Sequence, residues 1–215
     1  MKVKMKHVKQ YHSMPFVTPN GEELLIEGPV PPETVARYPL HEECDAFRIP
    51  EKQHQALIEI AGFEEARIIL AHNETVTVGY VTFLYPDPLE SWSDGHMEDL
   101  LELGAIEIAP AYRKGGLAKA LLKVAFMDPH MENYIVFTTE YCWHWDLKRT
   151  GLSVWEYRKV MEKVMNSAGL EWMATDDPEI CSHPANALMV RIGKQVPQSS
   201  IEAFDRLRLR RRYMY

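Results

Sequence analysis

The part of the sequence best suited to chemistry is a short basic loop that contains two adjacent glycines. The string Arg113-Lys-Gly-Gly-Leu-Ala118 follows an apolar stretch and precedes a run with helical spacing. The first turn of a helix has N–H groups without helical partners and a partial positive charge, so it attracts phosphate groups. The paired glycines would let a diphosphate approach the backbone, and the two basic residues would add positive charge. The pattern indicates a nucleotide diphosphate site, although a plain turn at a helix start also fits it.

The loop needs a strand before it and a helix after it. Positions 101–108 are typical of a strand that ends at Pro110, and positions 117–126 place apolar residues on one helical face and lysines on the other. The remaining pattern predicts strands at 23–30, 67–71, 76–85, 134–139 and 170–174, helices at 50–63, 154–168 and 184–193, and an exposed loop at 89–99. Interleaved strands and helices with an early hairpin predict an α/β protein with a mixed sheet.

The composition is that of an ordinary folded domain. With 215 residues, 46% hydrophobic and 26% charged, the chain is expected to form one domain at 23–215 after an N-terminal tail at 1–22. A net charge of -7 disfavours nucleic acid, and no apolar run suits a signal peptide or a membrane span. The three cysteines and nine histidines have no metal-ligand or disulfide spacing. We therefore expect reduced thiols, no metal and a cytoplasmic location.

In this context the loop resembles the signature of the GNAT superfamily of N-acetyltransferases. Arg113, Gly116 and Ala118 match its R/Q-x-x-G-x-G/A pattern after a strand and a Pro-Ala-Tyr approach. The resemblance covers roughly positions 23–193. It implies a GNAT fold, with a mixed central sheet, a splayed strand pair, helices on both faces and here an extended C-terminal part. It also implies acetyl-CoA as cosubstrate, with cofactor-binding residues Ile106, Ile108, Arg113, Lys114, Gly115, Gly116, Leu117 and Ala118.

Other strings are similar to a bacillar branch of this superfamily concerned with acetoin utilisation. They are Tyr85-Pro-Asp-Pro-Leu-Glu90, Thr139-Glu-Tyr141, Trp143-His-Trp-Asp146, Trp155-Glu-Tyr-Arg-Lys159 and Ser182-His-Pro-Ala-Asn186. This resemblance implies transfer of acetyl to a lysine of acetyl-CoA synthetase, which would inactivate that enzyme. A small-molecule amine acetyltransferase and a non-catalytic acyl-CoA-binding module are the alternatives.

Carboxylates near the predicted strand at 101–108 are the candidates for the catalytic base. A lysine amine has a reference pKa of about 10.4, so a proton acceptor is expected to help it become a nucleophile. Glu102 stands eleven residues before Arg113, where some lysine acetyltransferases of the superfamily carry their base. Glu107 should point to the opposite face of the strand, since side chains alternate. This argument favours Glu102, with Glu107 and then Glu140 as alternatives, and each could instead be a surface or ion-paired glutamate.

A general acid would also be needed to protonate the departing thiolate. Many superfamily members carry a tyrosine in a late helix that protonates the departing thiolate, but the corresponding place here holds Met189 or Val190. Tyr141 is a substitute candidate, although buried tyrosines more often pack with a satisfied hydroxyl.

Two further segments are rich in residues found at binding surfaces. The stretch at 142–154 contains Trp143 and Trp145, which suit either docking of a protein substrate or packing in the core. The basic run at 206–212 is interpreted as a solvated strand edge or tail, with a contact to a cofactor phosphate or an acidic partner as the alternative.

Overall fold

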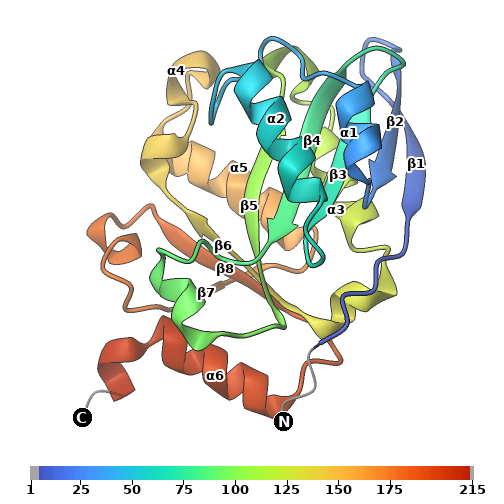
Figure 1. The fold of residues 1–215 in the computed structure, drawn as a ribbon. Helices are drawn as coiled ribbons and strands as arrows, with labels where there is room; N and C mark the ends of the chain where they lie inside the picture. The colour runs from blue at the N-terminus through green and yellow to red at the C-terminus, as the bar shows by residue number, and fades with distance from the viewer. Residues whose placement is uncertain (1–4, 214–215) are drawn as a thin grey trace. The chain divides into compact units, whose positions relative to one another are not determined.

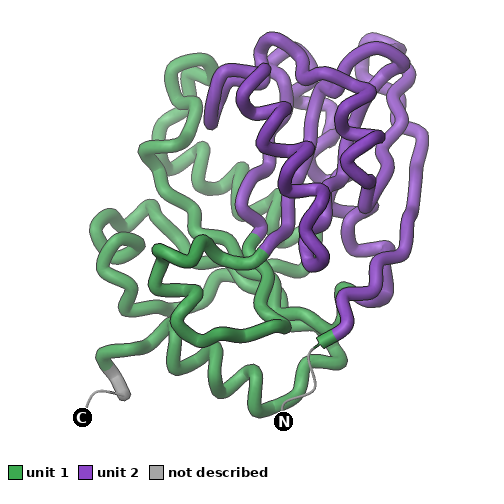
Figure 2. Tube along the Cα trace, in the orientation of Figure 1, with its two compact units in different colours: residues 1–5, 85–102, 131–215 green, residues 6–84, 103–130 purple. Residues whose placement is uncertain are grey.

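The computed structural model describes residues 5–213 of the chain, which fold into two compact units (Figures 1 and 2). The N-terminal unit consists of residues 6–84 and 103–130, and the C-terminal unit consists, among the described residues, of residue 5, residues 85–102 and residues 131–213. Strand β5 (Leu100–Ile108) contributes its first three residues to the C-terminal unit and the others to the N-terminal unit.

The N-terminal unit is a sheet covered by helices. Its strands are β1 (His12–Val17), β2 (Glu23–Gly28), β3 (Arg67–His72), β4 (Thr77–Leu84) and the later part of β5, in that order, and its helices are α1 (Pro32–Arg37), α2 (Pro50–Ala61) and α3 (Leu117–Ala125). Strands β1 to β4 are antiparallel neighbours. The predicted hairpin turn between β3 and β4 is held by the side chain of Asn73, whose Oδ1 accepts hydrogen bonds from the N–H groups of Thr75 and Val76.

Helices pack on both faces of this sheet because its strands carry apolar residues on both sides. Tyr80 of β4 belongs to a buried cluster with Val35 of α1 and Leu57 of α2. Phe83, three positions along the same strand and therefore on the other face, meets Phe126 at the end of α3 with ring centroids 5.7 Å apart.

The C-terminal unit contains both parallel and antiparallel pairs. Its strands follow the order β5, β6 (Ile135–Glu140), β8 (Ala187–Ile192) and β7 (Glu171–Met173), and its helices are α4 (Leu147–Thr150), α5 (Val154–Asn166) and α6 (Gln198–Arg208). The parallel ladder of β5 with β6 runs over Leu100–Glu102. β8 pairs antiparallel with both of its neighbours. Such a short parallel ladder in a mixed sheet agrees with the predicted α/β class and its splayed strand pair.

The start of α5 follows from local sequence, whereas the core of this unit joins residues far apart in the chain. Ser153 and Glu156 form a capping box that satisfies two N–H groups at the start of α5. The core contains Trp92, Phe137 and Phe204, with the ring of Trp92 4.9 Å from Phe137 and 6.1 Å from Phe204. Trp92 lies in a 3-10 turn at Ser91–Gly95, so the predicted exposed loop at 89–99 is in part a buried element.

Several sequence expectations are wrong. The predicted tail at 1–22 includes β1, an edge strand that tolerates Pro15 because one of its sides has no partner strand. The predicted helix at 184–193 is strand β8, because a short apolar run fits either element by periodicity and here lies between two strands. The basic run at 206–212 is not a strand but the end of α6 followed by a 3-10 turn. The extent of the domain at 23–215 stays a prediction.

Candidate active site

The basic loop joins β5 to α3, as the sequence predicts. Pro110–Tyr112 form a 3-10 turn, Lys114 and Gly116 have positive φ angles of 71° and 84°, and Gly116 is the N-cap of α3. The first hydrogen bond of the helix runs from the N–H of Ala120 to the carbonyl of Gly116. The N–H groups of residues 117–119 therefore have no acceptor within the helix and suit an anion.

Gly115 and Gly116 are suited to their positions for different structural reasons. A Cβ at Gly116 would meet nothing within 4 Å, so the space beside it is open to a ligand, while its positive φ favours glycine. A Cβ at Gly115 would instead lie 2.8 Å from Cδ of Pro19 and 3.1 Å from its Cγ. Gly115 is thus required by the turn between β1 and β2 rather than by space for a diphosphate.

The same turn and a neighbouring segment support the loop through hydrogen bonds. The hydroxyl of Tyr112 donates to Oε1 of Glu22 at 3.2 Å, and the N–H of Ala111 donates to Oε2 of Glu43 at 3.2 Å. Nε of Arg113 donates to the carbonyl of Ile108 at 3.1 Å. The predicted acetyl-CoA residues on β5 and in the loop thus lie together in the N-terminal unit.

Glu107 is held in the interior of that unit. Its side chain is 4% exposed, with Oε2 accepting a hydrogen bond from the hydroxyl of Tyr80 at 2.5 Å and Oε1 accepting one from the N–H of Ala46 at 2.7 Å. Burial raises its pKa, although these two hydrogen bonds lower it. Both oxygens are therefore engaged in joining β4, β5 and the segment around position 46, which is the geometry of a structural carboxylate.

Glu102 has different surroundings, in the C-terminal unit. It is the last residue of the ladder between β5 and β6, opposite Phe137, and its side chain is partly exposed. Burial, and after it the negative charges of Glu90 and Asp87, together raise its pKa from 4.5 to about 7. A carboxyl group with a pKa near 7 can accept a proton at neutral pH, which is what a general base requires.

Glu140 lies at the end of β6 and is buried. Its Oε2 accepts a hydrogen bond from Nε1 of Trp145 at 3.3 Å, and that indole stacks on Tyr157 of α5 with centroids 5.3 Å apart. Burial raises the pKa of Glu140 and outweighs the hydrogen bond from Trp145 and the charge of Arg158, which lower it, so that the pKa is about 7. Trp145 is therefore partly buried against Glu140 and α5, which favours the packing interpretation of the 142–154 stretch for this ring.

Tyr141 and Trp143 form a more open pair. Their rings stack at 4.8 Å with an interplanar angle of 16°, and the side chain of Trp143 is 50% exposed. The hydroxyl of Tyr141 donates to Oε2 of Glu179 at 3.5 Å. Burial raises the pKa of Tyr141, so its hydroxyl stays protonated at neutral pH.

The expected position of a tyrosine acid needs correction. Met189 and Val190 lie in strand β8, not in a helix, so they do not occupy the place of the late-helix tyrosine. Helix α5 does carry a tyrosine, Tyr157, at a position not predicted for this role. The signal available for it was the run Trp155-Glu-Tyr-Arg-Lys159 in a strongly predicted helix.

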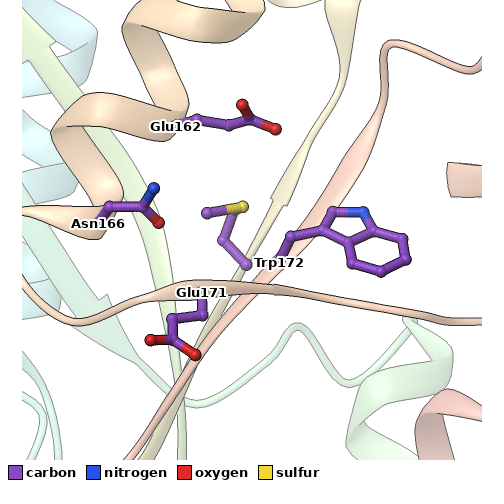
Figure 3. A pocket seen from close by; sticks show the side chains of 5 residues that line it. Glu162, Asn166, Glu171 and Trp172 are labelled. Atoms are coloured by element: carbon purple, nitrogen blue, oxygen red, sulfur yellow. The ribbon is translucent and has the colours of Figure 1, made fainter.

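The C-terminal unit also has an open groove of about 520 Å³ between α5, β7 and β8 (Figure 3). Its walls are formed by Glu162, Asn166, Glu171, Trp172 and Met189. Oε1 of Glu162 is paired with Nε of Arg158 at 2.8 Å. None of the predicted catalytic or acetyl-CoA residues lines this groove, so we assign it no part in acetyl transfer.

Over residues 5–213, no group of three histidine, cysteine or acidic side chains is placed to hold a metal ion. In the same range, no helix has both the length and the apolar character needed to cross a membrane.

Comparison with known proteins identifies the class to which this fold and loop belong. Residues 35–134, which end just beyond α3, match the acetyltransferase (GNAT) family. Because of this match, and because relatives of the chain align with it over nearly its whole length, the chain belongs to that family and is an acetyl-CoA-dependent N-acetyltransferase. The family and the enzyme class predicted from the sequence are confirmed.

Within the family, the chain is similar to the acetoin utilization protein AcuA. It is 63% identical to the protein of Bacillus subtilis and 61% identical to that of Bacillus licheniformis, in each case over 98% of this chain and 100% of the relative. The crystal structure of the acetoin utilization protein from Exiguobacterium sibiricum has a TM-score of 0.94 at 55% identity, covering 97% of this chain and 98% of that chain.

Proposed function

We propose that this enzyme transfers acetyl from acetyl-CoA to the side-chain amine of a lysine in another protein, in the cytoplasm. The proposed target is a lysine of acetyl-CoA synthetase, whose acetylation would inactivate it within acetoin and acetate metabolism. The names of the two Bacillus relatives support the metabolic setting. The observation that carries the lysine chemistry is Glu102, a partly exposed carboxyl group with a pKa of about 7.

The loop before α3 is proposed to bind the cosubstrate. N–H groups at the start of the helix suit the diphosphate of CoA, and the side chains of Arg113 and Lys114 suit its remaining negative charge. The open space beside Gly116 lets a phosphate approach this backbone. Backbone groups of Ile108 would bind the pantetheine arm, and the N–H of Ile106 would stabilise the oxyanion that forms on the thioester carbonyl.

The reaction transfers two protons from the lysine nitrogen. The ammonium group first gives one proton to Glu102, and the free amine then attacks the thioester carbonyl carbon. The carbon–sulfur bond breaks as the amide forms, and the nitrogen loses its second proton to solvent. CoA leaves as a thiolate that takes a proton from the general acid, and solvent then reprotonates that acid. Tyr141 is the proposed donor to the thiolate, since its hydroxyl retains its proton at neutral pH.

The raised pKa of Glu102 matters energetically. A lysine ammonium has a reference pKa of about 10.4, so giving its proton to an ordinary glutamate is strongly uphill. Raising the pKa of the accepting carboxylate from 4.5 to about 7 makes that proton transfer roughly 3 kcal/mol less unfavourable. Glu107 is less suited to this role because both of its oxygens already accept hydrogen bonds from the protein.

The test is acetylation of purified acetyl-CoA synthetase with labelled acetyl-CoA, followed by mass spectrometry to locate acetyl-lysine. The Glu102→Gln variant should bind acetyl-CoA normally in calorimetry but transfer acetyl slowly. Glu171→Gln, at an exposed strand glutamate, is the matched control and should act as the wild type. Transfer to free amines alone would identify a small-molecule acetyltransferase, and acetyl-CoA binding without any transfer would identify a regulatory module.

A further inference from the structure

Exposed carboxylates lie around Glu102 within the C-terminal unit. Glu90 and Asp87, in the segment after β4, act electrostatically on Glu102. Glu179 and Asp177, in the segment between β7 and β8, act on Glu90 and on Tyr141. Asp87, Glu90 and Glu179 are exposed. Two segments far apart in the sequence therefore contribute negative charge to one surface.

The aromatic pair is continuous with this surface. Tyr141 reaches Glu179 through its hydroxyl and stacks on the half-exposed Trp143. His144 meets both rings edge-on, with centroids 5.8 Å from Tyr141 and 6.0 Å from Trp143. An exposed indole supported from behind by two rings is a rigid platform for a partner.

Backbone contacts hold the acidic and aromatic parts in place. The side chain of Asn186 accepts a hydrogen bond from the N–H of Cys142 at 2.9 Å and donates one to the carbonyl of Glu179 at 3.3 Å. Ser182 donates a second hydrogen bond to that carbonyl at 2.6 Å. The surface is thus formed before a partner arrives, which reduces the entropy lost on binding.

The charges on this surface repel one another. Burial and then the negative charges of Asp87, Glu179 and Asp177 raise the pKa of Glu90. A cation placed among these groups would relieve that repulsion, and a guanidinium or ammonium group can also lie over the exposed face of an indole. Positive side chains complement both features.

We propose that Asp87, Glu90, Glu179, Tyr141 and Trp143 form a substrate-recognition surface that selects protein segments in which the acetylated lysine has basic neighbours. This inference rests on the proposed function, because it names the class of lysine substrate. It adds specificity residues outside the loop that binds acetyl-CoA.

The test uses three N-terminally acetylated peptides of equal length, each with one acceptor lysine flanked by arginine, serine or glutamate. The rate of transfer from acetyl-CoA gives kcat/KM for each. If two or three exposed charge pairs form between the arginine flanks and the surface, kcat/KM should be about tenfold higher for the arginine-flanked peptide than for the glutamate-flanked one, chiefly through a lower KM. The difference should shrink as NaCl is raised toward 1 M, because salt screens exposed charges.

Glu179→Gln and Trp143→Ala should each raise KM for the arginine-flanked peptide and reduce the preference, while calorimetry with acetyl-CoA verifies that each variant is folded. Trp172→Ala and Glu171→Gln are matched controls in the same unit, since Trp172 is 57% exposed but lines the groove of Figure 3. These controls should retain the preference.

Equal rates for all three wild-type peptides would overturn the inference and leave lysine acetylation intact. An effect of Trp172→Ala as large as that of Trp143→Ala would also overturn it. If acetyl-CoA binds but no lysine in any peptide or protein is acetylated, the proposed function fails and the inference fails with it.

Discussion

Replacing Gly115 with alanine is expected to weaken acetyl-CoA binding through a contact with the turn between β1 and β2. The new Cβ would lie 2.8 Å from Cδ and 3.1 Å from Cγ of Pro19. Carbon atoms normally approach to about 3.5–4.0 Å, so either the loop or the turn must move by several tenths of an ångström or more. Because the loop opens α3, its displacement would disturb the N–H groups proposed to bind the diphosphate.

The size of the effect can be worked from this contact. Overpacking costs about 1–3 kcal/mol, and the lower chain entropy of alanine returns about 0.4–1 kcal/mol. If the net cost of roughly 1–2 kcal/mol falls on the bound conformation of the loop, Kd for acetyl-CoA should rise about 5- to 30-fold. Pro19 is exposed, so Pro19→Ala alone should be nearly neutral, and it removes both clashing atoms.

The assay is calorimetric titration with acetyl-CoA, together with thermal unfolding of each variant. Gly115→Ala should bind weakly, and the double variant with Pro19→Ala should recover most of the lost affinity. Gly116→Ala is the control: its cost comes from a φ of 84°, so the change at Pro19 should not rescue it. The reasoning is refuted if Gly115→Ala binds as the wild type does, or if the double variant binds no better than Gly115→Ala.

Three other predictions concern buried or titrating groups. In a pH–rate profile, activity should rise with pH through about 7 as Glu102 loses its proton. Glu102→Gln should remove this inflection from the profile and lower kcat by about 10²–10⁴-fold. The pKa of Glu140 is raised to about 7 in the folded state, so the protonated group contributes fully to stability below pH 4.5, and this contribution is lost as the pH rises toward 7. Glu140→Gln, whose amide oxygen can still accept the hydrogen bond from Trp145, should reduce this loss of unfolding free energy with pH, measured by urea unfolding. An unchanged dependence of the unfolding free energy on pH would contradict the assignment. Arg67 and Asp128 are buried with Nε and Oδ2 3.7 Å apart, so Arg67→Met should lower the free energy of unfolding by about 3–5 kcal/mol, and a change under 1 kcal/mol would show that the pair is dispensable.

Much of the fold was predictable because its signals are local. The loop at 113–118, the helix after it and the hairpin of β3 and β4 depend on residues that are neighbours in the chain. Strand β8 was not predictable in this way, since its six apolar and basic residues suit either a helix or a strand until β6 and β7 enclose it. The edge strand β1 likewise exists because β2 offers it a partner.

The candidate site likewise has features that the sequence predicted and features that only the tertiary structure decided. Residue types and spacing alone indicated the basic loop and favoured Glu102 over Glu107. The tertiary structure decided that the oxygens of Glu107 are occupied by groups 27 and 61 residues away, and that Pro19 is the neighbour of Gly115. It also decided the pKa of Glu102, because burial and the charges of distant carboxylates act through space and depend on which segments the fold brings together.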